Sequence, residues 1–364
     1  MTYNEKPFSD SALAKRMLEK LYDSAQSAGR NFSFMEVCGT HTMAIAKSGI
    51  RAVLPENVRL LSGPGCPVCV TPPGVIDALL QAAALPGAVI AGFGDMLRVR
   101  GANGALEDCR LKGADVRVVY SPLDAVAIAE QNPRKTVIFA GVGFETTAPL
   151  SACAVKKAKA LKLKNFYVYP AFKLVPPALR ALLAPGGAAV DGFILPGHVS
   201  AVIGLEPYRF IPAEFRLPCV VAGFEPLDIL HAVNRLVSMV SENKPALENE
   251  YSRAVKPEGN PQAVRLLREV FEPADARWRA IGVIPASGLV FRQEWEEFDA
   301  ALSLSLSEPL SPEPQGCRCG EVITGKITPK QCPLFKTACT PSAPAGPCMV
   351  SSEGACAAWF HYGE

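Results

Sequence analysis

The residues best suited to chemistry in this sequence are its cysteines, of which there are 12 in 364 residues. The N-terminal stretch has neither a basic start nor a continuous apolar run, so we expect no secretory signal peptide and a cytoplasmic protein. Because the cytoplasm keeps thiols reduced, metal binding or redox chemistry explains the twelve cysteines better than a disulfide framework does. Half of them lie in the C-terminal tail, at Cys317, Cys319, Cys332, Cys339, Cys348 and Cys356.

The first thiol motif is Cys38-Gly-Thr-His41, which directly follows a run that predicts a strand. A thiolate and an imidazole at the exit of a strand can bind one soft metal such as iron, zinc or copper. Two other interpretations compete, an incidental cysteine near a histidine and a cysteine-protease-like pair. A second thiol motif nearby favours the metal site.

That second motif, Gly63-Pro-Gly-Cys66-Pro-Val-Cys69, also follows a predicted strand and places two cysteines in one turn. This spacing lowers the pKa of one thiol and permits reversible disulfide formation, which suits electron transfer. A structural zinc site is the alternative, but it requires a second pair of ligands at finger-like spacing, and none follows closely. We therefore predict a redox pair.

The cysteines of the tail are irregularly spaced. Four such thiolates suffice for a 4Fe-4S cluster, whereas zinc ribbons normally have two tight CxxC knuckles, which this tail lacks. The spacing favours iron-sulfur chemistry and leaves zinc as an alternative. On this interpretation one sulfur of Cys317 and Cys319 stays free beside the cluster, and Cys348 is a structural thiol. Cys109, Cys153 and Cys219 lie in or beside apolar segments and are expected to be buried without a role.

The elements that must position these motifs are short apolar runs that alternate with stretches of helical periodicity. Near-continuous apolar strands are typical of a parallel sheet covered on both faces. We therefore predict an α/β fold. Its expected strands are 34–37, 58–62, 88–92, 116–120, 136–140, 166–169, 192–195 and 220–222, with a later one at 281–290.

Polar side chains follow several of these strands, at Glu145, His198 and Glu225. Loops at the carboxyl ends of strands line the functional crevice of open α/β sheets, so these residues are candidates for a site. The rhythm of strands predicts one α/β domain at 30–125, which carries both thiol motifs, and a second at 126–235. A linker at 303–315, rich in Ser, Pro and Glu, leads into the cysteine tail.

The overall composition excludes several classes of function. The formal net charge of +2, from 37 basic and 35 acidic residues, provides no surplus for nucleic acid or anionic lipid. The most apolar stretch, 78–93, is interrupted by Pro86 and Gly87 and is too short to span a membrane. No phosphate-binding glycine loop is present, so nucleotide use has no support.

Four phrases together resemble the HypD family of hydrogenase maturation factors: Cys38-Gly-Thr-His41, Gly63-Pro-Gly-Cys-Pro-Val-Cys69, Gly143-Phe-Glu-Thr-Thr147 and Met349-Val-Ser-Ser-Glu-Gly-Ala-Cys356. The resemblance spans nearly the whole chain. It implies two α/β domains that face each other, and a helical, cysteine-rich part built from 1–29 with 236–364 that holds a 4Fe-4S cluster. It also implies a nickel-iron hydrogenase maturation factor that binds the small chaperone HypC. On that complex an iron carrying two cyanides and one carbon monoxide is assembled, with cyanide delivered by HypE, before transfer to the hydrogenase large subunit.

The resemblance also implies a role for each site residue. Cys38 supplies a thiolate to the iron and His41 supports or co-ligates it, while Cys66 and Cys69 relay electrons. Glu145 and Thr146 offer hydrogen bonds to cyanide or to the partner. The implied cluster ligands are Cys332, Cys339 and Cys356, with either Cys319 or Cys317 as the fourth.

Two other functions remain open from the sequence. An iron-sulfur thiol-disulfide oxidoreductase acting on a partner protein would use the same cluster and CxxC pair, but it has no need of Cys38 with His41. A zinc-stabilised binding module would give a colourless protein.

Overall fold

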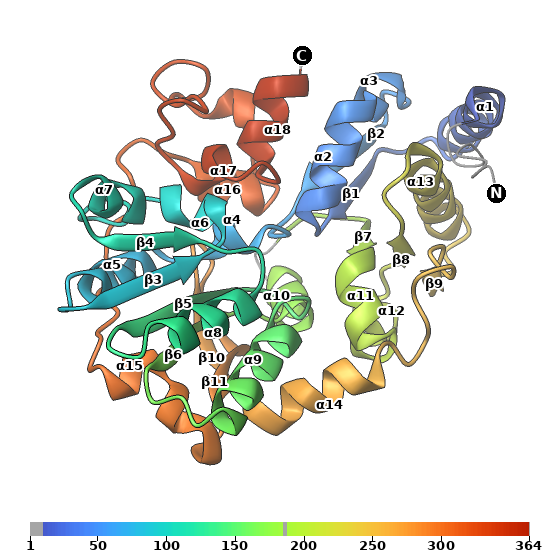
Figure 1. Ribbon diagram of the computed structural model, residues 1–364. Helices are drawn as coiled ribbons and strands as arrows, with labels where there is room; N and C mark the ends of the chain where they lie inside the picture. Colours follow the sequence, from blue (N-terminus) through green and yellow to red (C-terminus); the bar gives the residue numbers. More distant parts are fainter. Residues whose placement is uncertain (1–9, 185–187, 364) are drawn as a thin grey trace, which may run out of the picture.

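The computed structural model describes residues 10–184 and 188–363. It contains two parallel sheets and one antiparallel hairpin (Figure 1). The five-stranded sheet has the order β2-β1-β7-β8-β9, and the four-stranded sheet has the order β4-β3-β5-β6. The strands are β1 (Phe32–Glu36), β2 (Val58–Ser62), β3 (Ala88–Gly92), β4 (Asp115–Val118), β5 (Thr136–Gly143), β6 (Phe166–Phe172), β7 (Gly192–Pro196), β8 (Cys219–Ala222) and β9 (Leu247–Asn249), with β10 (Phe271–Trp278) and β11 (Gly282–Phe291) forming the hairpin.

Helices cover both faces of each parallel sheet. In the four-stranded sheet, Val137 and Phe139 face the core formed with α8 and α9, whereas Ile138 and Ala140 face the core formed with α5. This alternation of buried side chains explains the continuous apolar runs of the sequence. The covering helices are α1 (Ser11–Ser27), α2 (Gly39–Ser48), α3 (Ile50–Val53), α4 (Pro67–Val70), α5 (Pro73–Ala83), α6 (Gly94–Arg98), α7 (Leu106–Leu111), α8 (Pro122–Gln131), α9 (Ala148–Ala160), α10 (Val175–Leu182), α11 (Gly197–Ile203), α12 (Phe210–Phe215), α13 (Pro226–Ser241) and α14 (Pro261–Val270).

The α/β class with parallel sheets is confirmed, and so are the strands predicted before residue 230. Two observed strands were not predicted. β9 is three residues long and only half-buried, and β10 carries a proline and three charged side chains, with its interior residues exposed or half-buried. Neither presents the apolar run by which a buried strand is recognised.

The two sheets do not coincide with the predicted division of the chain at 125/126. That boundary lies inside the four-stranded sheet, because β3 pairs with both β4 and β5. The five-stranded sheet joins β1 and β2 to β7, which lies far along the sequence. Each sheet is thus built from both predicted units, because the chain leaves the first sheet after β2 and returns to it at β7.

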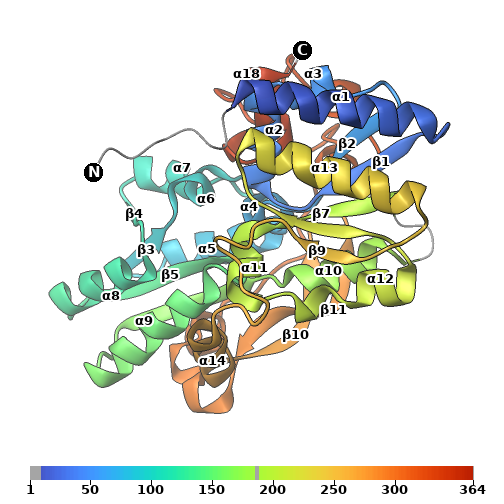
Figure 2. The same cartoon turned by 90° about the vertical axis from the view of Figure 1, so that its right-hand side faces the viewer.

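Helix α1 packs against α13, on the outer face of the five-stranded sheet (Figure 2). Leu21 of α1 shares a core with Phe34 of β1 and Ile194 of β7. The N-terminal helix therefore lies with this sheet rather than with the cysteine tail, with which the resemblance had grouped it.

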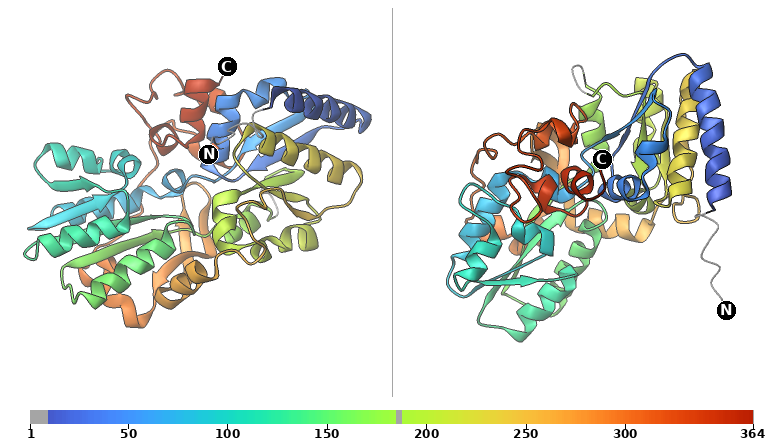
Figure 3. Two further views of the ribbon diagram at one scale, coloured as in Figure 1. Left: turned by 45° about the vertical axis from the view of Figure 1, so that its right-hand side comes forward. Right: turned by 90° about the horizontal axis from the view of Figure 1, so that it is seen from above.

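The C-terminal tail lies between the two sheets and beside α2 (Figure 3). Its short helices pack on the site-bearing elements, α17 on α4 and α18 on α2. The late elements are α15 (Ala300–Ser303), α16 (Cys319–Ile323), α17 (Pro347–Val350) and α18 (Ala355–Tyr362), with 3-10 helices at Glu206–Tyr208, Gln293–Phe298 and Pro329–Gln331. Within 10–184 and 188–363, no helix combines the length and apolar character that a membrane crossing requires.

Candidate functional site

The two thiol motifs lie against each other at the carboxyl ends of neighbouring strands. Cys38 follows β1 and caps α2, while Cys66 follows β2 and caps α4. The Gly39 N–H donates to the Gly65 carbonyl at 2.9 Å. A Cβ atom at residue 65 would lie only 2.1 Å from the Cys38 nitrogen, so only glycine permits this approach of the two loops.

A loop of the tail closes over the same point. The Thr40 hydroxyl donates to a carboxylate oxygen of Glu353 at 2.7 Å, and the Cys66 thiol donates to the Ser351 hydroxyl at 3.4 Å. A Cβ atom at residue 39 would lie 2.6 Å from the Glu353 Cβ. Three of the four phrases that carry the family resemblance therefore meet in one place.

Cys38 is buried at the N-terminus of α2. Burial raises the pKa of its thiol to about 11, and Glu353 adds to that shift, while the N–H groups of His41 and Thr40 oppose it. At neutral pH the group is therefore a thiol. Such a thiol is a poor free nucleophile, and a bound cation would be needed to favour its thiolate.

His41 is buried and presents one free ring nitrogen. Its Nε2 lies 2.8 Å from the Gly223 carbonyl, which can only accept, so Nε2 carries the proton. Burial lowers the pKa of the imidazole to about 4, so the ring is neutral. Nδ1 is buried and has no hydrogen-bond partner among the described residues. A neutral imidazole with one nitrogen fixed by a carbonyl and the other unpaired is the form that binds a metal.

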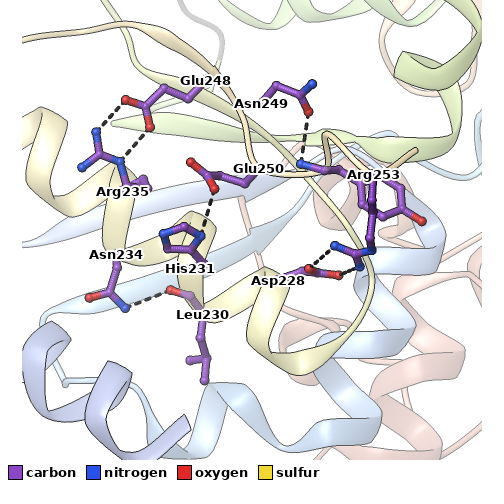
Figure 4. A network of polar contacts seen from close by, with 10 residues as sticks. Asp228, Leu230, His231, Asn234, Arg235, Glu248, Asn249, Glu250 and Arg253 are labelled. Carbon is purple, nitrogen blue, oxygen red and sulfur yellow. Dashed lines mark hydrogen bonds and ion pairs between the residues drawn. The ribbon is translucent and has the colours of Figure 1, made fainter. Parts of the chain in front are cut away.

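A polar network links α13 to β9 and the segment that follows it (Figure 4). Arg253 donates to Asp228 at 2.8 Å, and a Cβ atom at residue 223 would lie 2.1 Å from an Asp228 carboxylate oxygen. Beside it, His231 of α13 pairs at 2.9 Å with Glu250, which follows β9. Asp228 thus lies close against Gly223, whose carbonyl accepts from the imidazole of His41.

Glu145 and Thr146 follow β5 of the four-stranded sheet and differ in their burial. Glu145 is buried, accepts the Val175 N–H at 2.9 Å through Oε1, and leaves Oε2 without a partner among the described residues. Burial raises the pKa of its carboxyl to about 7. Thr146 is exposed, so only the glutamate is enclosed.

The buried Tyr208 connects the two sides of the site, and sequence reasoning missed it. Burial raises the pKa of its phenol, and the charges of Glu145 and Cys38 raise it further. Its hydroxyl accepts from the Ser200 hydroxyl at 3.4 Å. It lies in a 3-10 turn after α11, outside every strand exit, so no local pattern indicated it.

Cys66 and Cys69 are both buried free thiols. Cys66 accepts the Cys69 N–H through its sulfur at 3.3 Å, as the turn at the start of α4 requires. Burial and the neighbouring Cys66 raise the pKa of the Cys69 thiol, whereas Arg279 opposes the rise. The two sulfurs are thus adjacent, as a reversible disulfide requires.

All six tail cysteines line one small cavity of about 10 Å³, together with Leu334, Phe335, Gly346 and Met349. Cys319 and Cys348 form a disulfide. The other four are free. Burial raises the pKa of the Cys356 thiol, and the nearby Cys317, Cys339 and Cys332 raise it further, so these three thiols lie near Cys356. Among the described residues no three potential ligands converge as they would around a single metal ion. Four thiols around an apolar cavity nevertheless fit the donor set of an iron-sulfur cluster.

The remaining candidates lie around this centre. His198 stacks on Phe224 at 4.1 Å between ring centroids, and Phe224 packs on His41 at 4.6 Å. Glu225 is exposed and begins α13. Cys219 is buried in β8, whereas Cys109 and Cys153 are half-buried.

Fold and site together define an α/β protein with a buried thiol and a neutral imidazole at one strand exit, an adjacent CxxC pair and a cysteine-lined cavity. The HypD family model, described as the hydrogenase formation hypA family, matches residues 12–363. The hydrogenase maturation factor HypD of Escherichia coli (strain K12) is 44% identical over 351 residues, covering 96% of this chain and 94% of that protein. The hydrogenase expression/formation protein HupD of Azotobacter chroococcum mcd 1 is 43% identical, covering 98% and 96%. The HypD of Cupriavidus necator is 42% identical, covering 100% and 98%. The chain belongs to the HypD family of hydrogenase maturation factors.

Proposed function

We propose that this protein, in complex with the small chaperone HypC, is the scaffold on which the iron with two cyanides and one carbon monoxide is assembled. The observation that carries the proposal is the meeting of Cys38, His41 and the CxxC turn under one loop of the tail. Cyanide and carbon monoxide favour low-spin ferrous iron, whose assembly requires soft ligands, reducing equivalents and exclusion of water. Buried sulfur and nitrogen donors beside a redox pair meet these requirements.

In this proposal each residue of the centre has a distinct task. Cys38 binds the iron as a thiolate, and Nδ1 of His41 is the second ligand from this chain. Cys66 and Cys69 cycle between disulfide and dithiol. Glu145, with its unpaired buried Oε2, donates a hydrogen bond when protonated and faces the cargo or the partner.

A 4Fe-4S cluster held in the tail would supply electrons one at a time to the CxxC pair. We assign its ligands to Cys317, Cys332, Cys339 and Cys356, because these four are free and the first three lie near Cys356, whereas Cys319 is paired with Cys348. In the sequence the fourth ligand was open between Cys317 and Cys319. The same environment raises the pKa of the Cys317 thiol through burial, so the positive charge of bound iron would be needed to favour thiolates.

The proposed partners are HypC, which shares the iron, HypE, which delivers cyanide, and the hydrogenase large subunit, which receives the product through HypC. In this proposal the protein acts in the cytoplasm, where these steps occur together.

The test is an anaerobic purification of the chain with HypC, followed by infrared spectroscopy and counts of iron, zinc and acid-labile sulfide. We expect cyanide and carbon monoxide bands together with about four cluster irons. Cys38→Ala should remove the bands and retain the sulfide, whereas Cys109→Ala, on α7, should leave both unchanged. Infrared bands of full intensity in Cys38→Ala would overturn the assignment.

The second candidate function is an iron-sulfur thiol-disulfide oxidoreductase acting on a partner protein. The contact of the CxxC turn with the tail favours it. In that case Cys38→Ala would leave reduction of the partner disulfide unchanged, and no cyanide band would appear in any sample.

A further inference from the structure

A buried arginine lies between the CxxC turn and the cysteine-lined cavity and belongs to neither motif. Arg279 follows β10, and only 2% of its surface is exposed. Its backbone N–H donates to the Val70 carbonyl at 2.8 Å, and its Nε–H donates to the Thr71 carbonyl at 2.9 Å. Both acceptors directly follow Cys69, so one hydrogen bond from the backbone and one from the guanidinium hold Arg279 against this turn.

The positive charge of Arg279 is only partly compensated. Its Nη1 lies 3.3 Å from Glu313, whose side chain is 44% exposed. Apart from this ion pair, neither Nη1 nor Nη2 has a hydrogen-bond partner among the described residues. Burial lowers the pKa of the guanidinium, and the negative charges of Glu313, Cys69 and Cys317 oppose that shift. The groups that can stabilise this cation are therefore a surface carboxylate and two thiols, one in each thiol centre.

We propose that Arg279 is a positioning residue that sets the redox potential of the Cys66–Cys69 pair by stabilising negative charge on its reduced form. The inference rests on the redox role proposed above. Reduction breaks one S–S bond and adds two electrons, with two protons if both sulfurs become thiols and one proton if one remains a thiolate. A fixed cation favours the reduced state to the extent that one sulfur is a thiolate, and it then raises the potential, as it does wherever the reduced form of a dithiol is stabilised.

The experiment uses the full chain, purified anaerobically and equilibrated in dithiothreitol or glutathione buffers of graded ratio. Two buffer thiols form one disulfide for each Cys66–Cys69 disulfide that is reduced, so the step balances. Free thiols are then alkylated. The tryptic peptide 60–98 contains Cys66 and Cys69 and no other cysteine, so its mass reports the reduced fraction.

We expect Arg279→Met to shift the equilibrium about tenfold towards the disulfide, which lowers the potential by about 30 mV. Arg279→Lys keeps the charge and should remain close to the wild-type midpoint. Glu313→Gln removes the counter-charge and should shift the equilibrium the opposite way, by about two- to threefold, because this exposed carboxylate is screened by water.

An electrostatic effect shifts the midpoints of Arg279→Met and Glu313→Gln in opposite directions, whereas damage to packing would shift both midpoints in the same direction. Glu313 is partly exposed, so Glu313→Gln keeps the test available if Arg279→Met does not fold. Two results together would overturn the inference. The first is an equal midpoint in the wild type and in Glu313→Gln, and the second is an Arg279→Met midpoint that is unchanged or shifted towards the dithiol. A wild-type pair that forms no disulfide at any ratio would instead refute the redox role on which it rests.

Discussion

Cys38 and His41 are held by the ends of regular elements, whereas the free tail cysteines are held by loops and short helices. β1 and α2 place the first pair, and the hydrogen bond between Gly39 and Gly65 joins them to the next strand. Of the four free tail thiols, only Cys356 lies within a helix, the eight-residue α18. The first site is thus formed by the backbone of the sheet. The second has little regular structure of its own, so we expect its order to depend on what the sulfurs bind.

Cys332→Ala tests this contrast most strongly. Removal of one cluster ligand should abolish the acid-labile sulfide and expose 316–363 to trypsin, because metal binding is coupled to folding of such segments. Sulfide analysis and limited proteolysis measure the two effects. Cys38→Ala is the control, since it should leave the tail resistant. Equal protection of the tail in the two variants would contradict the contrast.

Cys317→Ala and Cys319→Ala sharpen the description of the cavity. The first should lose most of the cluster iron, because Cys317 is a free neighbour of the other three sulfurs. The second should retain iron, because Cys319 is engaged with Cys348. Iron and sulfide counts on the two purified variants decide between them, and the reverse pattern would move the fourth ligand to Cys319.

Gly65→Ala tests whether the strand-end site is formed by backbone packing. Its Cβ atom would lie 2.1 Å from the Cys38 nitrogen, and backbone cannot yield as a flexible side chain can. We expect a loss of about 3 kcal/mol in the free energy of unfolding, measured by urea denaturation. Gly94→Ala is the matched control, because its Cβ would make only an ordinary contact of 3.9 Å with Val118. Equal stability of the two variants would show that the loops adjust freely.

Glu145→Gln tests the opposite wall of the site through pH. The pKa of the buried carboxyl is raised from 4.5 to about 7, so the folded state retains a proton that the unfolded state has lost. Stability should therefore fall as pH rises from 4.5 to 7, by an amount on the order of 2 kcal/mol. The fall should be smaller in Glu145→Gln, whereas Glu225→Gln, an exposed carboxylate at another strand exit, should behave as the wild type. Urea denaturation at pH 5, 6 and 7 measures these slopes, and identical slopes in all three proteins would exclude Glu145 as their source.

Local patterns were sufficient for strands with a buried face, including 58–62, whose alternate side chains are buried, and 88–92, which is buried on both faces; these match β2 and β3 residue for residue. They failed for β9, which is half-buried throughout, and for β10, which is exposed or half-buried between its buried ends Phe271 and Trp278, because neither strand has an apolar run. The order of strands in the sheets was equally inaccessible. Pairing of β1 with β7 depends on a long-range return of the chain that no local residue encodes.

The sequence by itself determined the thiol motifs, the strand exits that bear them and the family, because these depend on residue type and short spacing. Only the tertiary structure decided which groups meet. It placed the tail loop on the CxxC turn, left Nδ1 of His41 unpaired, and brought Tyr208 and Arg279 to the two sides of the centre. These features arise from contacts between segments far apart in the chain, and burial then sets their charges, so no local pattern could contain them.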